Sequence, residues 1–147
     1  MKRAIATPFL LLLLCTSCAD ADLQKVAKSM LVLANAVGEV QKDTMTAVDS
    51  KLIDQALGVE IVGVCVRVNT AGQQVDAVLR SIQKLDPASR SNLIALLTPI
   101  SQALDPTKLE FVAGIKDPAT KQKIEGGFII ARSALSAVQL TIATGSN

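Results

Sequence analysis

The 147 residues include no His, no Tyr and no Trp, and these absences restrict the chemistry that the protein can perform. Without His, the chain lacks the usual general base near neutral pH and the commonest ligand of transition metals. The acidic residues are dispersed along the chain, so a clustered carboxylate site for a metal ion is not expected either. We therefore expect a protein that is not an enzyme and that holds neither a metal ion nor a cofactor.

An excess of positive charge is also missing. The chain has 15 basic and 13 acidic residues, and two of the bases, Lys2 and Arg3, precede an apolar run at the N-terminus. The rest of the chain then carries equal numbers of both signs. Proteins that bind nucleic acids need a basic patch to neutralise phosphates. The sequence thus gives no reason to expect DNA or RNA as a partner.

The N-terminal apolar run, Ala4 to Cys15, has the length of a signal-peptide core and is too short for a membrane-spanning helix. Thr16, Ser17 and Cys18 follow it. This end resembles the lipobox of bacterial lipoproteins, in which a Leu and two small residues precede the lipidated Cys. Thr16 and Ser17 match the small positions and Cys18 matches the modified one. The pattern departs at Cys15, where Leu is preferred, because Leu14 stands one place too early.

The resemblance, which ends at residue 18, implies a signal peptide over 1–18 and a lipid on Cys18. The protein would then be held at a membrane of the bacterial cell envelope by this anchor. Two alternatives remain open: ordinary cleavage after Ala19 with release into the periplasm, or an uncleaved anchor. If the signal peptide is removed, Cys65 is the one cysteine of the mature domain other than Cys18. No internal disulfide is then expected.

Residues 19–147 are enough for one domain, and their apolar residues recur at steps of three and four, which is typical of amphipathic helices. This spacing predicts long helices near 22–48, 54–85, 87–104 and 118–143, with a short helical segment at 106–114 between the last two. The positions predicted to face inward in the first and last helices are Leu23, Val26, Met30, Leu33, Val37, Val40, Ile124, Phe128, Ala131, Leu135, Val138 and Ile142.

Three Asp-Pro pairs mark helix starts at Pro87, Pro106 and Pro118. In each pair the Asp can accept hydrogen bonds as the N-cap, and Pro is tolerated in the first helical turn because its missing N–H would have no partner there. Four amphipathic helices joined by short connections must bury their apolar stripes against one another. We therefore predict an all-α fold: an antiparallel four-helix bundle with an extra short helix before the last long helix.

A polar stretch interrupts the middle of the second predicted helix around Ala71 and Gly72. It contains Arg67, Asn69, Thr70, Gln73 and Gln74. The functional interpretation is a face on which a partner helix approaches closely and forms hydrogen bonds, and its candidate residues are Cys65, Asn69, Gly72 and Gln73. The alternative is a solvated surface with a small-residue gap beneath it. Cys65 itself either packs as a small apolar residue or links two chains by a disulfide.

One catalytic pattern occurs, since Ser81 and Lys84 have the S-x-x-K spacing of serine acyltransferases. The companion elements S-D-N and K-T-G are absent, so a structural role of both residues at a helix end is favoured. The sequence as a whole favours an exported, lipid-anchored envelope protein with a structural or protein-binding role. The alternatives are a carrier of an apolar ligand or lipid within the bundle, and a membrane-active protein with amphipathic helices.

Overall fold

The computed structural model describes residues 21–144, and the regular elements in that range are helices without any strand. The helices are α1 (Ala21–Asp49), α2 (Gln55–Ser81), α3 (Pro87–Ala103) and α4 (Pro118–Thr144), and a 3₁₀-helix, η1 (Pro106–Gly114), precedes α4. The prediction of an all-α fold is therefore confirmed. The predicted signal peptide, 1–18, and the candidate lipidation residue Cys18 lie outside the described residues.

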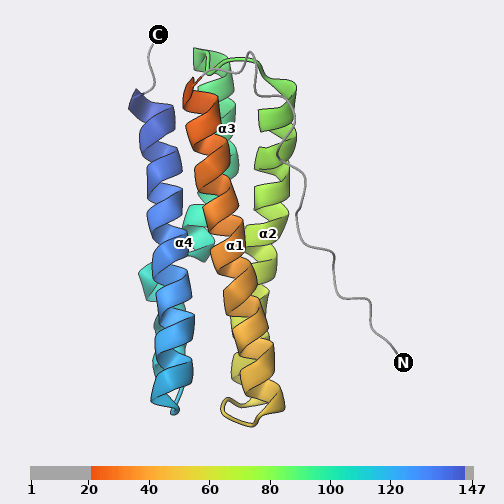
Figure 1. The fold of residues 1–147 in the computed structure, drawn as a ribbon, viewed down its shortest axis with the longest axis vertical. Coiled ribbons are helices and arrows are strands. Elements are labelled where there is room, and N and C mark those ends of the chain that lie inside the picture. The colour runs from red at the N-terminus through yellow and green to blue at the C-terminus, as the bar shows by residue number, and fades with distance from the viewer. Residues whose placement is uncertain (1–20, 145–147) are drawn as a thin grey trace, which may run out of the picture.

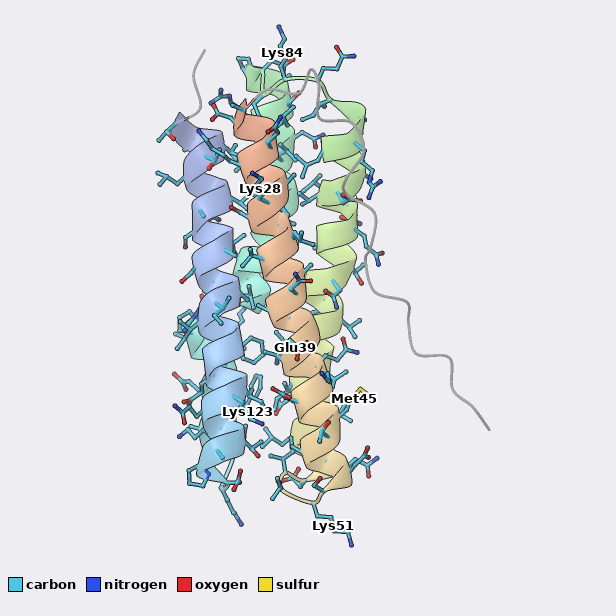
Figure 2. All side chains as sticks on the ribbon, viewed as in Figure 1. Lys28, Glu39, Met45, Lys51, Lys84 and Lys123 are labelled. Carbon is cyan, nitrogen blue, oxygen red and sulfur yellow. The ribbon has the colours of Figure 1, made fainter. Side chains whose placement is uncertain are left out.

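The helices form a bundle in which α1 lies beside α2 and α4, while α3 contacts α2 and α4 from the other side (Figure 1). The contact between α1 and α4 is the most extensive, and η1 contacts α2 and α4. The beginning of α1 and the end of α4 lie at one end of the bundle, which also carries Lys84 (Figure 2). Lys51, in the connection from α1 to α2, lies at the opposite end.

The inner positions predicted for the first and last helices are all buried, so the apolar spacing identified these two seams correctly. Burial of such side chains is the main favourable term in folding. A polar residue, Thr44, is also fully buried in α1. Its hydroxyl donates to the carbonyl of Val40 at 2.7 Å, so the polar group is satisfied within its own helix.

Small residues let α1 approach two of its neighbours closely. A Cβ added at Gly127 of α4 would overlap Cγ2 of Val40, and a Cβ added at Gly58 of α2 would overlap Cγ2 of Val48. At both glycines a side chain of α1 occupies the space that a methyl group would need. At these two levels α1 therefore packs directly against the backbone of α2 and of α4.

The second helix ends earlier than the sequence predicts. Its apolar spacing continues to Leu85, but α2 stops at Ser81, and Ile82 has extended backbone angles of φ −106° and ψ 148°. Leu85 is nevertheless buried, so its apolar side chain joins the core from a connecting segment. Its carbonyl accepts a hydrogen bond from Nε of Arg90 at 2.7 Å. The spacing of apolar residues indicates which residues are buried. Here it continues beyond Ser81, where the helix ends.

Arg90, in the first turn of α3, also forms a hydrogen bond to the end of α4. Its guanidinium donates to the carbonyl of Ile142 at 2.9 Å, near the last turn of α4. Carbonyls in the last turn of a helix lack helical donors and favour a nearby cation. Arg90 thus fixes the start of α3 to the end of α4 while it also holds the connection that precedes α3.

The predicted Asp caps are present. The carboxylate of Asp86 accepts from the backbone N–H of Ser89 at 2.7 Å. Asp105 accepts from Thr107 at 2.9 Å, and Asp117 accepts from Thr120 at 2.8 Å. These hydrogen bonds lower the pKa of each capping carboxyl: the backbone N–H of Ser89 is the main cause at Asp86, and the Thr hydroxyls, then the backbone N–H groups, are the causes at Asp105 and Asp117.

The lowered pKa values predict that stability falls in acid. Because the folded state binds the proton more weakly than the unfolded chain, the caps contribute fully above the usual value of 3.8 and lose this contribution as the pH falls through the lowered values. We expect the midpoint temperature of unfolding, measured by circular dichroism, to decrease below about pH 4. Replacing all three Asp residues by Asn keeps the caps but removes the titration. An equally steep decrease in that variant would contradict the assignment.

Candidate functional site

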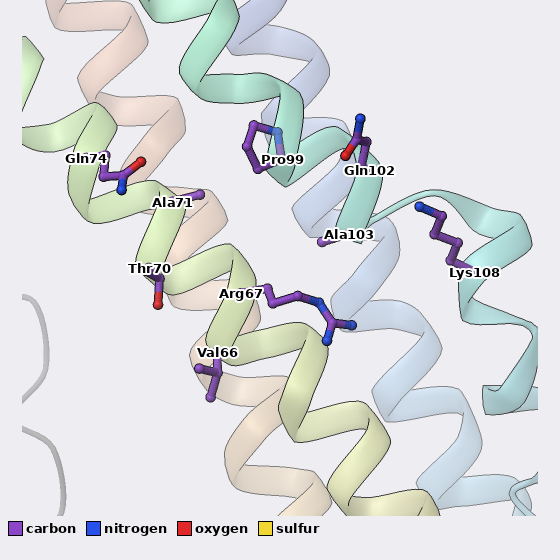
Figure 3. Close-up of a pocket in the computed structure, with 9 residues that line it drawn as sticks. All are labelled: Val66, Arg67, Thr70, Ala71, Gln74, Pro99, Gln102, Ala103 and Lys108. Carbon is purple, nitrogen blue, oxygen red and sulfur yellow. The ribbon is translucent and has the colours of Figure 1, made fainter.

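A groove forms where α3 ends, because α3 has 17 residues and its neighbour α2 has 27. The space has a volume of about 580 Å³ and lies between α2 on one side and α3 with η1 on the other (Figure 3). Its lining residues are Val66, Arg67, Thr70, Ala71, Gln74, Pro99, Gln102, Ala103 and Lys108. The groove is therefore built by three elements that are separate in the sequence.

The α2 wall follows one side of the helix. Arg67, Thr70 and Gln74 are exposed at steps of three and four, so they lie in a row along this side. Val66 borders the row and is 50% exposed, whereas Ala71 is buried and forms part of the floor. The wall therefore combines polar side chains at the rim with apolar surface below them.

The opposite wall is the last part of α3. Pro99 lies inside this helix and is exposed, and Gln102 is exposed one turn later. Pro has no backbone N–H, so the carbonyl of Ala95 loses its usual donor from the following turn. Ala95 is not among the residues that line the groove, so the α3 wall offers the amide side chain of Gln102 beside the apolar ring of Pro99.

Two cations line the groove without an acidic residue among its lining. Figure 3 shows Arg67 reaching from α2 toward the end of α3, and Lys108 pointing from η1 toward the same space. The ion pairs found in residues 21–144 include neither of them. The nearby carboxylate of Asp105 accepts hydrogen bonds from the N–H and the hydroxyl of Thr107, at 2.9 Å and 2.6 Å. In addition to these hydrogen bonds, Lys108 helps to lower the pKa of Asp105 through its charge, so its charge is partly balanced by that carboxylate, whereas Arg67 takes part in no ion pair found in residues 21–144. The lining of the groove itself is cationic.

The four residues predicted as a close-contact face lie on a different side of α2. Cys65 is buried, Asn69 and Gly72 are half-buried, and Gln73 is exposed. A Cβ added at Gly72 would lie 3.9 Å from Cε of Met30 in α1, which is an ordinary contact. At Gly72 this side therefore faces α1, Gln73 remains exposed to solvent, and none of the four residues lines the groove. The binding of a partner there stays a prediction.

Cys65 is completely buried, which bears on the alternative of a disulfide-linked dimer. Burial raises the pKa of its thiol to about 12, so the reactive thiolate is not formed near neutral pH. We expect iodoacetamide at pH 8 to modify Cys65 only after the protein is unfolded, as read by mass spectrometry of the tryptic peptide. Modification of the folded protein at the rate of a free thiol would contradict this burial.

The possible S-x-x-K pair is not arranged on one helix. Ser81 is the last residue of α2, and its hydroxyl donates to the carbonyl of Val78 at 2.8 Å. Because Ile82 is extended, Lys84 does not lie one helical turn after Ser81. The helical geometry that the spacing would require for a Ser–Lys pair is therefore missing at this point.

The outer side of α4 is a second candidate surface. It exposes Ile129, Ile130 and Leu140, and Arg132 is the one charged residue between Glu125 and the end of the helix. Within residues 21–144, α4 alone is long and apolar enough to cross a membrane, judged by length and composition only. Its inner side is packed in the core, so this composition arises because both sides of the helix are apolar.

Another groove, of about 530 Å³, lies at the end of the bundle that carries Lys51 and Lys116. Lys51 has a positive φ of 58° and follows the end of α1. The N–H of Leu52 bonds to the carbonyl of Ala47 at 2.8 Å, and that of Lys51 bonds to Val48 at 3.0 Å. This is the Schellman pattern that ends many helices, and it explains the positive φ of Lys51 without a functional role.

The structure adds Pro99, Gln102 and Lys108 to the residues that sequence reasoning considered. Arg67, Thr70 and Gln74 belong to the polar stretch that the sequence did indicate, but their partners across the groove carry no signal of their own. In residues 21–144 no cluster of side chains suited to a metal ion occurs. Comparison with protein-family models, curated proteins and solved structures finds no match to this chain.

Proposed function

We propose that the protein is an exported, lipid-anchored component of the bacterial cell envelope that binds another protein and catalyses no reaction. The observation that supports this proposal best is the groove between α2 and α3, which joins apolar surface to two cations and hydrogen-bonding amides, with no acidic residue in its lining. Such a combination of an apolar base and a polar rim is typical of surfaces that bind partners. The lipobox-like residues Thr16, Ser17 and Cys18 support the anchored location.

For the domain we propose the antiparallel four-helix bundle predicted from the sequence, with η1 as the extra short helix before α4. The sequence of contacts, from α1 to α2, α2 to α3, α3 to α4 and α4 back to α1, supports a closed arrangement. In this arrangement η1, which follows the end of α3, contacts both α2 and α4. A rigid bundle of this kind suits a module that presents a surface, since its helices hold the two walls of the groove in place.

The anchor would keep the bundle close to the membrane. Only residues 19 and 20 separate Cys18 from α1, so the connection spans at most about 11 Å. Gln74 and Arg67 lie 7 and 14 residues before the end of α2, which corresponds to about 10 and 20 Å along the helix. The groove would then open beside the membrane at a height that another envelope protein can reach.

The anchoring part of the proposal is tested by replacing Cys18 with Ser. We expect this variant to leave the membrane fraction, because the thiol that carries the lipid is lost. Cys15→Leu is the matched control: it restores the preferred lipobox residue and should remain in the membrane fraction. Mass spectrometry of the mature N-terminus should give Cys18 with acyl mass. A Cys18→Ser protein that still sediments with membranes would refute lipid anchoring.

The binding part is tested with a photo-crosslinking amino acid at Gln102 in living cells. We expect a discrete crosslinked product from this position, and none from Glu39, an exposed residue of α1 that serves as the control. The product is then identified by mass spectrometry. Absence of any crosslink from Gln102 and from a second groove position, Gln74, would count against a partner in the groove.

The membrane-active alternative draws support from one observation, the exposed apolar side chains on the outer side of α4, where Arg132 is the one charged residue after Glu125. It would require this helix to leave the bundle or to lie on the bilayer with Ile129, Ile130 and Leu140 inserted. Release of a dye from phospholipid vesicles by the processed protein would support it. No comparable observation supports the carrier alternative, since both described grooves lie at the surface rather than between the inner seams.

A further inference from the structure

We infer that the occupant of the groove between α2 and α3 is an extended, acidic segment of the partner protein. This inference rests on the proposed function and gives the partner a chemical class. It depends on three properties of the groove: the sign of its charge, the kind of polar groups on its walls, and its openness at the surface.

The charge of the groove selects an anionic partner. Arg67 and Lys108 approach from opposite walls, and neither takes part in the ion pairs found in residues 21–144. An acidic segment lying along the groove would therefore meet a cation on each wall: Arg67, which has no ion pair to displace, and Lys108, whose charge is only partly balanced by Asp105. Arg in particular binds a carboxylate through two parallel N–H groups. Cationic segments would be repelled at the same positions.

The polar groups on the walls favour a peptide backbone. Thr70 and Gln74 lie on the α2 wall and Gln102 lies on the α3 wall. Amide and hydroxyl side chains can donate to and accept from the backbone groups of an extended chain, whose N–H and C=O groups are free. A helical partner has already paired most of these backbone groups. The walls therefore match an extended segment better than a helix.

The shape of the groove also distinguishes a peptide from a lipid. A volume of about 580 Å³ lies in the range of sites for small ligands, so the groove admits a short segment and not a folded surface. Exposed residues form both rims, including Val66 at 50% exposure and Gln102. An acyl chain placed here would remain in contact with water, whereas the backbone of a peptide tolerates water.

The test measures binding of a short fluorescein-labelled peptide of alternating Glu and Leu to the full processed chain by fluorescence anisotropy. We expect the double charge reversal Arg67→Glu with Lys108→Glu to weaken binding by at least about tenfold. The matched control reverses Lys28 and Lys123, which are exposed cations on α1 and α4 away from the groove (Figure 2). It should leave binding within about twofold. The thermal midpoints of both variants verify that the fold is kept.

Equal weakening by both double variants, or binding of a Lys and Leu peptide with similar affinity, would overturn the inference. Displacement of the acidic peptide by dodecanoate at a lower concentration than by unlabelled peptide would also overturn it, in favour of an anionic amphiphile. The crosslinking experiment separates this inference from the proposed function. A crosslink from Gln102 that survives the Arg67 and Lys108 reversal leaves the proposed function in place and refutes the acidic segment. Binding of the acidic peptide without any crosslink in cells would count against a partner protein in the groove, while the groove's preference for acidic peptides would stand.

Discussion

Replacing Phe128 with Ala is expected to lower the free energy of unfolding by about 3–5 kcal/mol. Phe128 lies in α4 with 2% of its side chain exposed, within the seam that packs against the rest of the core. Removing the ring loses the burial of its apolar surface and leaves a cavity that the neighbouring helices can fill only in part. Domains of this size are stable by about 5–15 kcal/mol, so the change removes a large fraction of the total.

The measurement is equilibrium unfolding in urea, followed by circular dichroism, with the slope of the transition checked for two-state behaviour. Ile129→Ala is the matched control because it truncates the next residue, whose side chain is 53% exposed. We expect this control to change the free energy of unfolding by no more than about 0.5 kcal/mol. Similar losses in both variants would show that the inward side of α4 is assigned incorrectly.

Replacing Gly127 with Ala is expected to destabilise the protein, although Ala is the better helix former. The added methyl group would overlap Cγ2 of Val40, and it would also lie 3.6 Å from the carbonyl oxygen of Ala36. Val40 is buried, and a Val side chain in a helix has one strongly preferred rotamer, so it cannot turn aside easily. Overpacking of this kind costs about 1–3 kcal/mol.

The adjacent glycine supplies the control. A Cβ added at Gly126 would have no atom within 4 Å, so Gly126→Ala should stabilise the helix by up to about 1 kcal/mol. The two substitutions, one residue apart, are therefore expected to change the free energy of unfolding in opposite directions. Stabilisation by Gly127→Ala would mean that α1 and α4 are less closely packed at this level than described.

Much of the helical framework follows from local sequence signals. The spacing of apolar residues identifies the inner sides of α1 and α4, and the three Asp-Pro pairs mark the starts of α3, η1 and α4. Both signals depend on groups that are near each other in the chain, namely side chains one turn apart and a carboxylate beside free N–H groups. The same reasoning failed at Leu85, because burial and helical conformation coincide along most of the chain but separate at that residue.

The sequence identified the polar stretch of α2 but did not predict which of its residues line the groove. The sequence indicated Cys65, Asn69, Gly72 and Gln73 as one face, and the structure places Gly72 against α1 while Gln73 stays exposed. Two other members of the stretch, Arg67 and Gln74, line the groove together with Lys108. Helical spacing shows which residues share a side of one helix, but it does not tell which neighbouring helix that side meets.

The sequence by itself determined that the described chain is helical, where three of its helical elements begin, and which residues of α1 and α4 are buried, because these properties depend on neighbours within a few residues. Tertiary structure decided the remaining features: the close contacts at Gly58 and Gly127, the Arg90 link between α3 and α4, and the groove beside the end of α3. Each of these needs the position of one helix relative to another. That position results from the packing of all the seams together, and no short segment of the sequence encodes it.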